Sequence, residues 1–370
     1  MNNKRIKQIA MAIIAVLLLT ACNTQAEPLT SESYTRGYSV YIEDRTSYFI
    51  LGNPYLMAQP LPLPELMENE RIGGFGFGVD AYQIVHPPGT AVYGRIMMTD
   101  VDDYIAIYIE HLAPIDTYFV LKLFINYEEV YFRVRGTSDY VTKFIFPLHG
   151  SYEVYIPVAL NIDVPNENYT YRLTAAAFAD PYSVLVVDEE SALSYWREGL
   201  AFILDADLVF GSGGEISLTE IPYSASIERR ENAFFAELTI NQIFEGFETM
   251  EYAGNPGLFI QVNTGEEIKL AFYAHLHPSY GYDMTDYLIV ALLDWQQISI
   301  NNRSYLHVMV DNHHDFNRIV DHGVLTLPAI NEPGIYAFTA FMISHPREAI
   351  SLSNSFPGFP SNRILIEVVE

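Results

Sequence analysis

The residues best suited to metal chemistry are histidines, and most of them lie in the C-terminal half of the chain: His275, His277, His307, His313, His314, His322 and His345. His275 and His277 would share one face of a strand, because side chains alternate with period two. Neutral imidazoles beside a carboxylate, as in the stretch 311–315, suit zinc or another transition metal. No recognised zinc spacing occurs, so we expect structural histidines. A metal site at His275, His277, His313 and His314 is the alternative.

Two aromatic residues, Tyr127 and Trp295, follow expected strands at matching positions in the two halves of the chain. If they were exposed, the rings could stack on a sugar, and Asp294 could hydrogen-bond to its hydroxyls. If they were buried, the rings would cover the end of a β core, since aromatic side chains supply much of a core's buried area. We favour the core and keep a ligand site at Trp295, Tyr127 and Asp294 as the alternative.

The short motifs of common enzymes are missing. Ser212 has Phe210 where the nucleophile motif Gly-x-Ser-x-Gly needs its first glycine, and neither His-Glu-x-x-His nor a P-loop occurs. The glycine-rich stretch 73–78 continues as an expected strand, which is not the setting of a phosphate loop. Residues 99–103 lack the ligand order and central glycine of a calcium-binding EF-hand and are expected to form a solvated turn, like their counterpart 263–267. We therefore predict a protein that is not an enzyme and holds no cofactor.

Short alternating runs of apolar residues, separated by turn-forming residues, predict an all-β protein. The expected strands are 104–109, 118–125, 152–156, 171–178, 268–273, 287–293 and 335–343. Tyrosine and phenylalanine are abundant, at 27 and 22 residues, and this bias favours strands. Only the segment 189–200 is expected to be helical.

The chain also resembles itself, which predicts a duplicated domain. Residues 117–127 align with 285–295, and Tyr171, Thr174 and Pro181 recur in the same order as Tyr336, Thr339 and Pro346. A repeat of this length is a domain, not a solenoid unit. The predicted organisation is a first β-sandwich at 38–190, a linker at 191–221 with a glycine-rich hinge at 211–214, and a second β-sandwich at 222–370.

The segment Glu332-Pro333-Gly334-Ile335-Tyr336 resembles the start of the F strand of immunoglobulin-type domains. The resemblance implies a tyrosine corner, in which the hydroxyl of Tyr336 bonds back to the preceding loop. In the first copy, residues 167–171 keep the acidic residue and Tyr171 but lack the glycine. The predicted fold is two tandem immunoglobulin-like β-sandwiches that arose by internal duplication, preceded by a signal peptide helix. The resemblance carries no active site.

The N-terminus has the order of a secretory signal peptide: a basic start at Lys4, Arg5 and Lys7, then an apolar run at 9–19 that is too short to be a permanent membrane span. The following Leu19-Thr20-Ala21-Cys22 resembles a bacterial lipobox, and Cys22 is the only cysteine in the chain. The resemblance implies that residues 1–21 are removed and that Cys22 is acylated, with 22–37 as a tether. We expect a lipid-anchored protein on the extracytoplasmic face of the cell membrane or envelope, attached through N-terminal diacylglycerol and acyl chains, palmitate among them.

The formal net charge of −26 makes nucleic acid an improbable partner, because the surface repels phosphates. Half of the residues are hydrophobic, which is enough for a sizeable core. We expect a non-catalytic binding or scaffolding lipoprotein whose partner is an extracellular protein or a glycan. The alternatives are a carbohydrate-binding accessory lipoprotein, or a metal-binding protein or enzyme that uses the histidine-rich second half.

Overall fold

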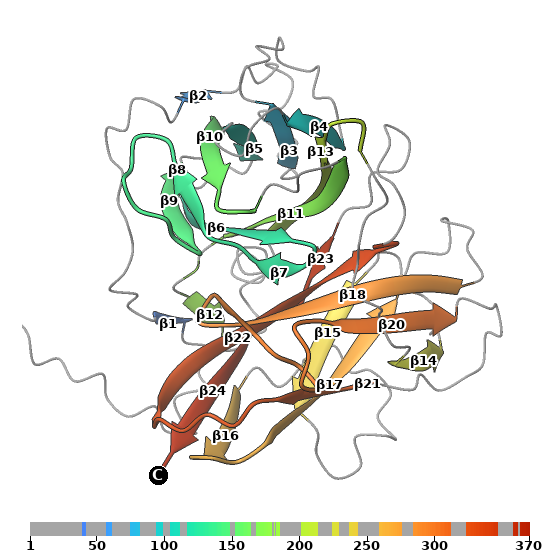
Figure 1. Ribbon diagram of the computed structural model, residues 1–370. Helices are drawn as coiled ribbons and strands as arrows, with labels where there is room; N and C mark the ends of the chain where they lie inside the picture. Colours follow the sequence, from blue (N-terminus) through green and yellow to red (C-terminus); the bar gives the residue numbers. More distant parts are fainter. Residues whose placement is uncertain are drawn as a thin grey trace, which may run out of the picture.

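The computed structural model describes residues 39–41, 57–60, 75–81, 94–98, 104–111, 117–148, 152–163, 168–179, 181, 183–185, 201–213, 224–228, 237–242, 259–275, 284–311, 323–346, 358–361 and 363–370. Within these ranges the chain forms strands and no helix, arranged as two β-sandwiches stacked against each other (Figure 1). The predicted all-β class is confirmed. The signal peptide, Cys22, the tether and the expected helix at 189–200 lie outside the described residues.

The first sandwich has one sheet centred on β10, in the order β3-β5-β10, with β2 and β8 each pairing with a different end of β10. Its strands are β2 (Met57–Pro60), β3 (Phe75–Ala81), β5 (Ile105–His111), β8 (Phe132–Val134) and β10 (Tyr152–Leu160). All pairs in this sheet are antiparallel. We call it the outer sheet of the first sandwich.

The facing sheet runs β4-β13-β11-β6, with β7 and β9 both pairing with β6. Its strands are β4 (Arg95–Met98), β6 (Thr117–Ile125), β7 (Glu128–Glu129), β9 (Phe144–Leu148), β11 (Tyr169–Ala179) and β13 (Ala201–Phe210). The edge strand β4 is parallel to β13, and the other pairs are antiparallel. A separate two-stranded ribbon joins β1 (Ser39–Tyr41) to β12 (Ser183–Leu185).

The second sandwich repeats this plan. Its small sheet runs β15-β17-β21, and its large sheet runs β16-β24-β22-β18-β20-β14, with β19 beside β18 and β23 beside β22. The edge strand β16 is parallel to β24, as β4 is to β13. The bounds are β14 (Ser224–Glu228), β15 (Glu237–Gln242), β16 (Phe259–Asn263), β17 (Ile268–His275), β18 (Met284–Leu293), β19 (Gln296–Ile298), β20 (Leu306–Asp311), β21 (Gly323–Leu327), β22 (Gly334–Ser344), β23 (Phe359–Pro360) and β24 (Ile364–Val369).

The strand order is that of an immunoglobulin-like sandwich. In spatial order, β3-β5-β10-β8 corresponds to the ABED sheet and β6-β11-β13 to the CFG sheet. The second sandwich has the same CFG order in β18-β22-β24. The predicted tyrosine corner is also present in both copies: the Tyr336 hydroxyl donates to the Glu332 carbonyl (2.9 Å), and the Tyr171 hydroxyl donates to the Asp163 carbonyl (2.7 Å). The immunoglobulin-like expectation is confirmed.

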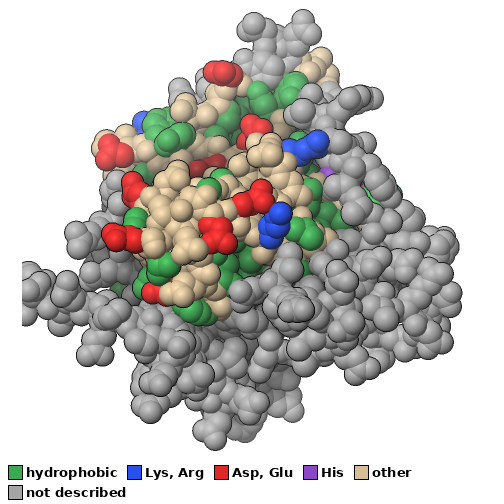
Figure 2. All heavy atoms as spheres, turned by 90° about the horizontal axis from the view of Figure 1, so that it is seen from below, with side chains coloured by type: hydrophobic (Ala, Val, Ile, Leu, Met, Phe, Trp, Pro, Cys, Tyr) green, Lys and Arg blue, Asp and Glu red, His purple; other side chains and the backbone are tan. Residues whose placement is uncertain are grey.

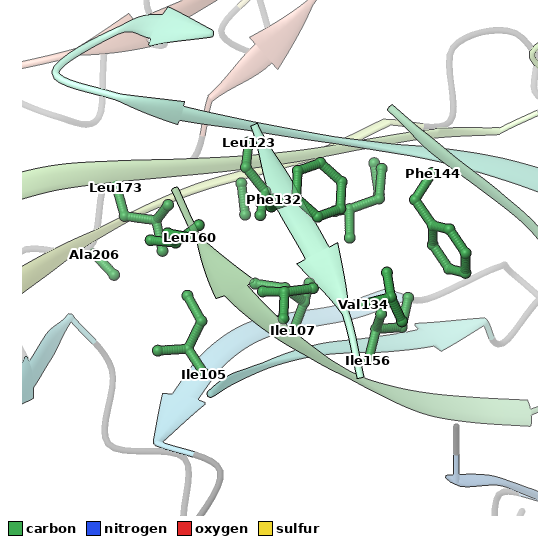
Figure 3. Packing of buried hydrophobic residues seen from close by; sticks show 14 of the residues in the cluster. Ile105, Ile107, Leu123, Phe132, Val134, Phe144, Ile156, Leu160, Leu173 and Ala206 are labelled. Carbon is green, nitrogen blue, oxygen red and sulfur yellow. The ribbon is translucent and has the colours of Figure 1, made fainter. Parts of the chain in front are cut away.

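Each sandwich encloses its own hydrophobic core, because alternate residues of both sheets point inward. In the first core, Ile105, Ile107, Ile156 and Leu123 are fully buried between the sheets (Figure 3). The second core is built from equivalent strands: Leu270, Tyr287, Ile289, Phe338, Met342 and Ile366 are all buried. Every one of the seven strands expected from the sequence occurs, as β5, β6, β10, β11, β17, β18 and β22.

The expected limit of the first sandwich needs a correction. Residues 201–210, assigned to the linker, form β13, which pairs with β11 along its length. Two aspartates, Asp205 and Asp207, interrupt the apolar run of this strand. Both are buried, because Arg172 of the neighbouring strand pairs with them. The first sandwich therefore extends at least to Phe210.

Candidate functional site

The two sandwiches meet through the CFG sheets of both halves, and the side chains with chemical potential gather at this interface. A buried hydrophobic cluster, which we call the interface cluster, joins residues of the two halves: Val120, Phe124, Tyr127, Ile145, Ala176, Phe178, Ile203, Leu288, Val290, Leu292, Trp295, Phe341 and Ile343. At the edge of this interface the two halves lie so close together that a Cβ atom on Gly358 of the second half would lie 2.2 Å from Ile203 Cγ2 of the first. The interface is thus packed like a domain core.

Two equivalent hairpin turns carry the aromatic residues singled out from the sequence. Asn126-Tyr127 joins β6 to β7, and Asp294-Trp295 joins β18 to β19, with positive φ at both positions of each turn (49° and 66°, 47° and 64°). Two-residue hairpins of type I′ require this backbone, which normally selects glycine at the second position. A bulky ring in this region carries strain. The contacts that each ring makes across the interface offset the cost of this backbone strain.

Tyr127 is fully buried and reaches the second sandwich. Its hydroxyl donates to Asp205 Oδ2 (3.0 Å) and lies 3.2 Å from the carbonyl oxygen of Pro346. Burial, with Asp205 nearby, raises the pKa of Tyr127 well above its ordinary value. The phenol therefore stays protonated and acts as a donor.

Trp295 makes the equivalent contact in the opposite direction. Its Nε1 donates to the carbonyl oxygen of Pro181 in the first half (2.9 Å), and its ring lies 5.2 Å from that of Phe178. The Arg363 guanidinium lies 4.9 Å from the Trp295 ring centroid and donates to the Ala179 carbonyl. Because Pro181 and Pro346 are themselves equivalent in the repeat, the two halves contact each other reciprocally, as the subunits of a twofold dimer do.

These contacts decide how the aromatic residues can act. Trp295 is 5% exposed and Tyr127 is 0% exposed, so neither ring face is open to a sugar. The Asp294 side chain accepts a hydrogen bond from the backbone nitrogen of Ala337 (2.8 Å), just as Asn126 accepts one from Arg172 (3.0 Å). The rings are buried as we favoured, but between the two sandwiches and not at the end of one core. The alternative of sugar stacking at Tyr127 and Trp295 does not fit this structure.

A charged cluster lies on the first-half side of the interface. Arg172 donates through Nε to Asp207 (2.9 Å) and through Nη1 to Asp205 (3.2 Å) and to the Pro346 carbonyl (3.3 Å). Burial opposes the charge on Arg172, but the acidic groups around it raise its pKa. Burial raises the pKa of Asp205, although Arg172, Thr174 and Tyr127 counteract this. With donors on both of its oxygens, Asp205 has the environment of a carboxylate.

A buried lysine stands where the two halves meet near the hairpins. Lys122 is 0% exposed and forms an ion pair with Glu129. Burial lowers the pKa of Lys122 to about 8, and Glu129 limits the shift. The Glu129 backbone nitrogen donates to Gln297 Oε1 (2.6 Å), and the Gln297 backbone nitrogen donates to Glu129 Oε1 (3.4 Å). Since Glu129 and Gln297 are equivalent residues, this contact lies on the approximate twofold axis.

Two histidines of the second half, His307 and His345, flank the carboxylate of Asp286, which the sequence analysis did not single out. His307 Nε2 lies 3.3 Å from Asp286 Oδ2, and His345 Nδ1 lies 3.8 Å from Asp286 Oδ1. Burial would raise the pKa of Asp286, but the hydrogen bond to His307 and the charges of the two imidazoles lower it. In the sequence, only the alternation of side chains along β18 and β20 could have indicated that Asp286 and His307 lie together.

Of the four histidines offered as metal ligands, His275 ends β17 and its side chain lies outside the described residues. His277, His313 and His314 lie outside them altogether. Among the described residues, no group of three or more His, Cys, Asp or Glu is placed to hold a metal ion. The metal hypothesis therefore stays a prediction about residues that the structure does not describe.

The outward face of the outer sheet of the first sandwich is different, because its aromatic side chains reach solvent. Tyr108 and Tyr155 stand opposite each other on β5 and β10, with ring centroids 4.6 Å apart, and both are partly exposed. Arg135 lies 5.5 Å from the Tyr104 ring centroid, which is also on this face. We call Tyr104, Tyr108, Tyr155 and Arg135 the tyrosine face.

The overall surface agrees with the acidic composition. Exposed glutamates include Glu266, Glu267 and Glu332 of the second sandwich, and acidic side chains are spread over the described part of the face in Figure 2. In the part of the chain that the structure describes, there is no helix long and apolar enough to cross a membrane.

Comparison with known proteins finds likenesses of fold only. No protein-family model matches the chain, and no curated protein matches it. Among solved structures, it is similar to red sea bream transglutaminase (10% identity, 80% of this chain and 31% of that one, TM-score 0.20). It is also similar to the C-terminal domain of the Streptococcus pyogenes antigen I/II-family protein AspA (7%, 80% and 98%, 0.19) and to the E. coli chaperone DraB (8%, 80% and 97%, 0.23). The chain thus spans about a third of the transglutaminase, and none of these likenesses bears on function.

Proposed function

We propose that this protein is a surface-anchored lipoprotein with a non-catalytic binding or scaffolding role outside the cytoplasmic membrane. The observation that carries the proposal is the order of the N-terminus: three basic residues, an apolar run, and Leu19-Thr20-Ala21-Cys22. With a net charge of −26, the body is repelled by an anionic membrane surface, so the anchor must be lipid.

The non-catalytic part of the proposal is supported by how the reactive side chains are used. Arg172, Asp205 and Lys122 are nearly or fully buried, and each is held by partners within or across the interface. A catalytic side chain needs access to a substrate. A buried side chain whose polar atoms all have hydrogen-bond partners typically has a structural role. Two sandwiches joined through a buried face form a rigid body, which suits a scaffold.

The anchor is tested with the full chain expressed in a bacterium that makes lipoproteins. Intact mass and peptide mass spectrometry of the membrane fraction are expected to show Cys22 as the N-terminal residue with a diacylglycerol group. The control is Cys22→Ser, which is expected to carry no lipid, because the thiol that would be modified is missing. An unmodified Cys22 in the mature membrane-bound protein would refute the anchoring.

A second candidate function, carbohydrate binding, is favoured by the tyrosine face. Partly exposed tyrosines on one sheet face offer rings for stacking and hydroxyls for hydrogen bonds. A glycan array is expected to give hits that Tyr155→Ala abolishes. Tyr118→Ala, also at an exposed tyrosine (36%), serves as the matched control and should bind normally. An array without hits would refute this candidate and leave the anchored scaffold unaffected.

A further inference from the structure

The two faces that meet at the interface are equivalent surfaces of the two copies, yet their charged residues differ. The strand register fixes the correspondence, because Leu173 pairs with Ala206 in the first sandwich as Phe338 pairs with Ile364 in the second. The equivalent pairs are Lys122 and Val290, Glu129 and Gln297, Arg172 and Ala337, Asp205 and Arg363, and Asp207 and Leu365.

The charges at these positions are complementary between the halves. The first half contributes two cations, Lys122 and Arg172, and three carboxylates, Glu129, Asp205 and Asp207, a net charge of minus one. Among its described residues, the second half contributes one buried cation, Arg363, which is 1% exposed. Asp286 of the second half lies at the rim with 25% of its side chain exposed and two imidazoles beside it. Among the described residues, the charges at the buried centre of the paired interface therefore cancel.

Self-pairing of either half would remove this balance. Two first halves would place the Glu129 carboxylate where the Gln297 side-chain amide now donates to the Tyr127 carbonyl, and would place Asp205, an acceptor, where Arg363 now donates to the Ala179 carbonyl. Two second halves would bury two Arg363 side chains without the first half's excess carboxylate. Buried charge without compensation strongly destabilises an association.

We infer that the two halves are specific partners: each interface is built for the other half and against a copy of itself. The association then rests on the surfaces and not on the chain that links them. Like-charge contacts in the wrong pairs give this specificity in the way that repulsive elements do in other interfaces.

The test uses the full chain with a protease recognition sequence inserted after Gly214, between β13 and β14. After cleavage, native mass spectrometry is expected to show one copy of each half bound together, with no pairs of identical halves. Separation of the halves on cleavage, or identical pairs in comparable amount, would overturn the inference.

Two variants test the role of charge in the cleaved protein. Arg363→Glu is expected to weaken the association roughly 100-fold or more, because it buries a carboxylate against the Ala179 carbonyl oxygen and the face of the Trp295 ring. Lys269→Glu makes the same charge change at a solvent-exposed ion pair with Glu267 and should have little effect. Equal weakening by both would show that net charge alone matters and would refute specific pairing.

A third variant keeps the inference testable if Arg363→Glu does not fold. Gln297→Glu reproduces on the axis the contact between two glutamates that a pair of first halves would make, at a partly exposed hairpin residue outside the cores of both sandwiches. It should weaken the association by roughly tenfold, a cost typical of an unfavourable charge contact at an interface. Unchanged association of this variant would contradict the inference.

Discussion

Replacing Trp295 tests both the interface and the unusual backbone beneath it. Trp295→Ala removes a ring that is 95% buried, its hydrogen bond to Pro181 and its contacts with Phe178 and Arg363. Truncating a buried tryptophan to alanine costs about 3–5 kcal/mol. We therefore expect the free energy of unfolding to fall by about that amount.

Trp295→Gly should be less damaging than Trp295→Ala, which reverses the usual order of these two residues. At φ 64° a Cβ is strained, and glycine removes about 1 kcal/mol of that cost. Urea unfolding followed by far-ultraviolet circular dichroism measures all three proteins. The surface control Tyr131→Ala, at a residue 55% exposed, should change stability by less than about 0.5 kcal/mol.

Either of two results would refute this reasoning. A loss below about 1 kcal/mol in Trp295→Ala would mean that the ring does not join the sandwiches. A glycine variant less stable than the alanine variant would mean that the hairpin does not hold the positive φ described here.

Four further predictions concern three other contacts. Glu129→Gln leaves the buried Lys122 ammonium without a carboxylate and should cost about 3–5 kcal/mol in urea unfolding, more than Lys122→Met does. Because burial lowers the pKa of Lys122 from 10.5 to about 8, the folded chain binds fewer protons there than the unfolded chain between these values. The stability of the wild type relative to Lys122→Met should then rise from about pH 8 to pH 10.5, and a constant difference would contradict this. The pKa of Asp286 is lowered, so its contribution is present above its ordinary value of 3.8 and is lost as the pH falls below it. The advantage of the wild type over Asp286→Asn should shrink in that range, and thermal unfolding at several pH values measures it. Tyr336→Phe removes the corner hydrogen bond to Glu332 and should cost about 1 kcal/mol, measured by urea unfolding; an unchanged midpoint would show that the corner adds nothing.

Much of the fold could be predicted from local features. Alternation of apolar and polar residues located strands such as 118–125 and 335–343, because a strand with one face in a core must repeat with period two. The tyrosine corners were predictable because each tyrosine bonds to a carbonyl only four or eight residues before it, within one short segment. The β13 strand was missed because its two aspartates find their partner, Arg172, on a different strand.

The amino-acid sequence by itself determined the all-β class, the duplication and the pairing of Tyr127 with Trp295 as equivalent residues, since these follow from periodicity and internal similarity. Only the tertiary structure decided that these rings join the two sandwiches, that Arg172 and Asp205 share a buried network, and that Asp286 lies between His307 and His345. The physical reason is that burial and charge compensation depend on which surfaces meet. The contacts between these surfaces join residues more than 110 positions apart, and no local pattern in the sequence indicates them.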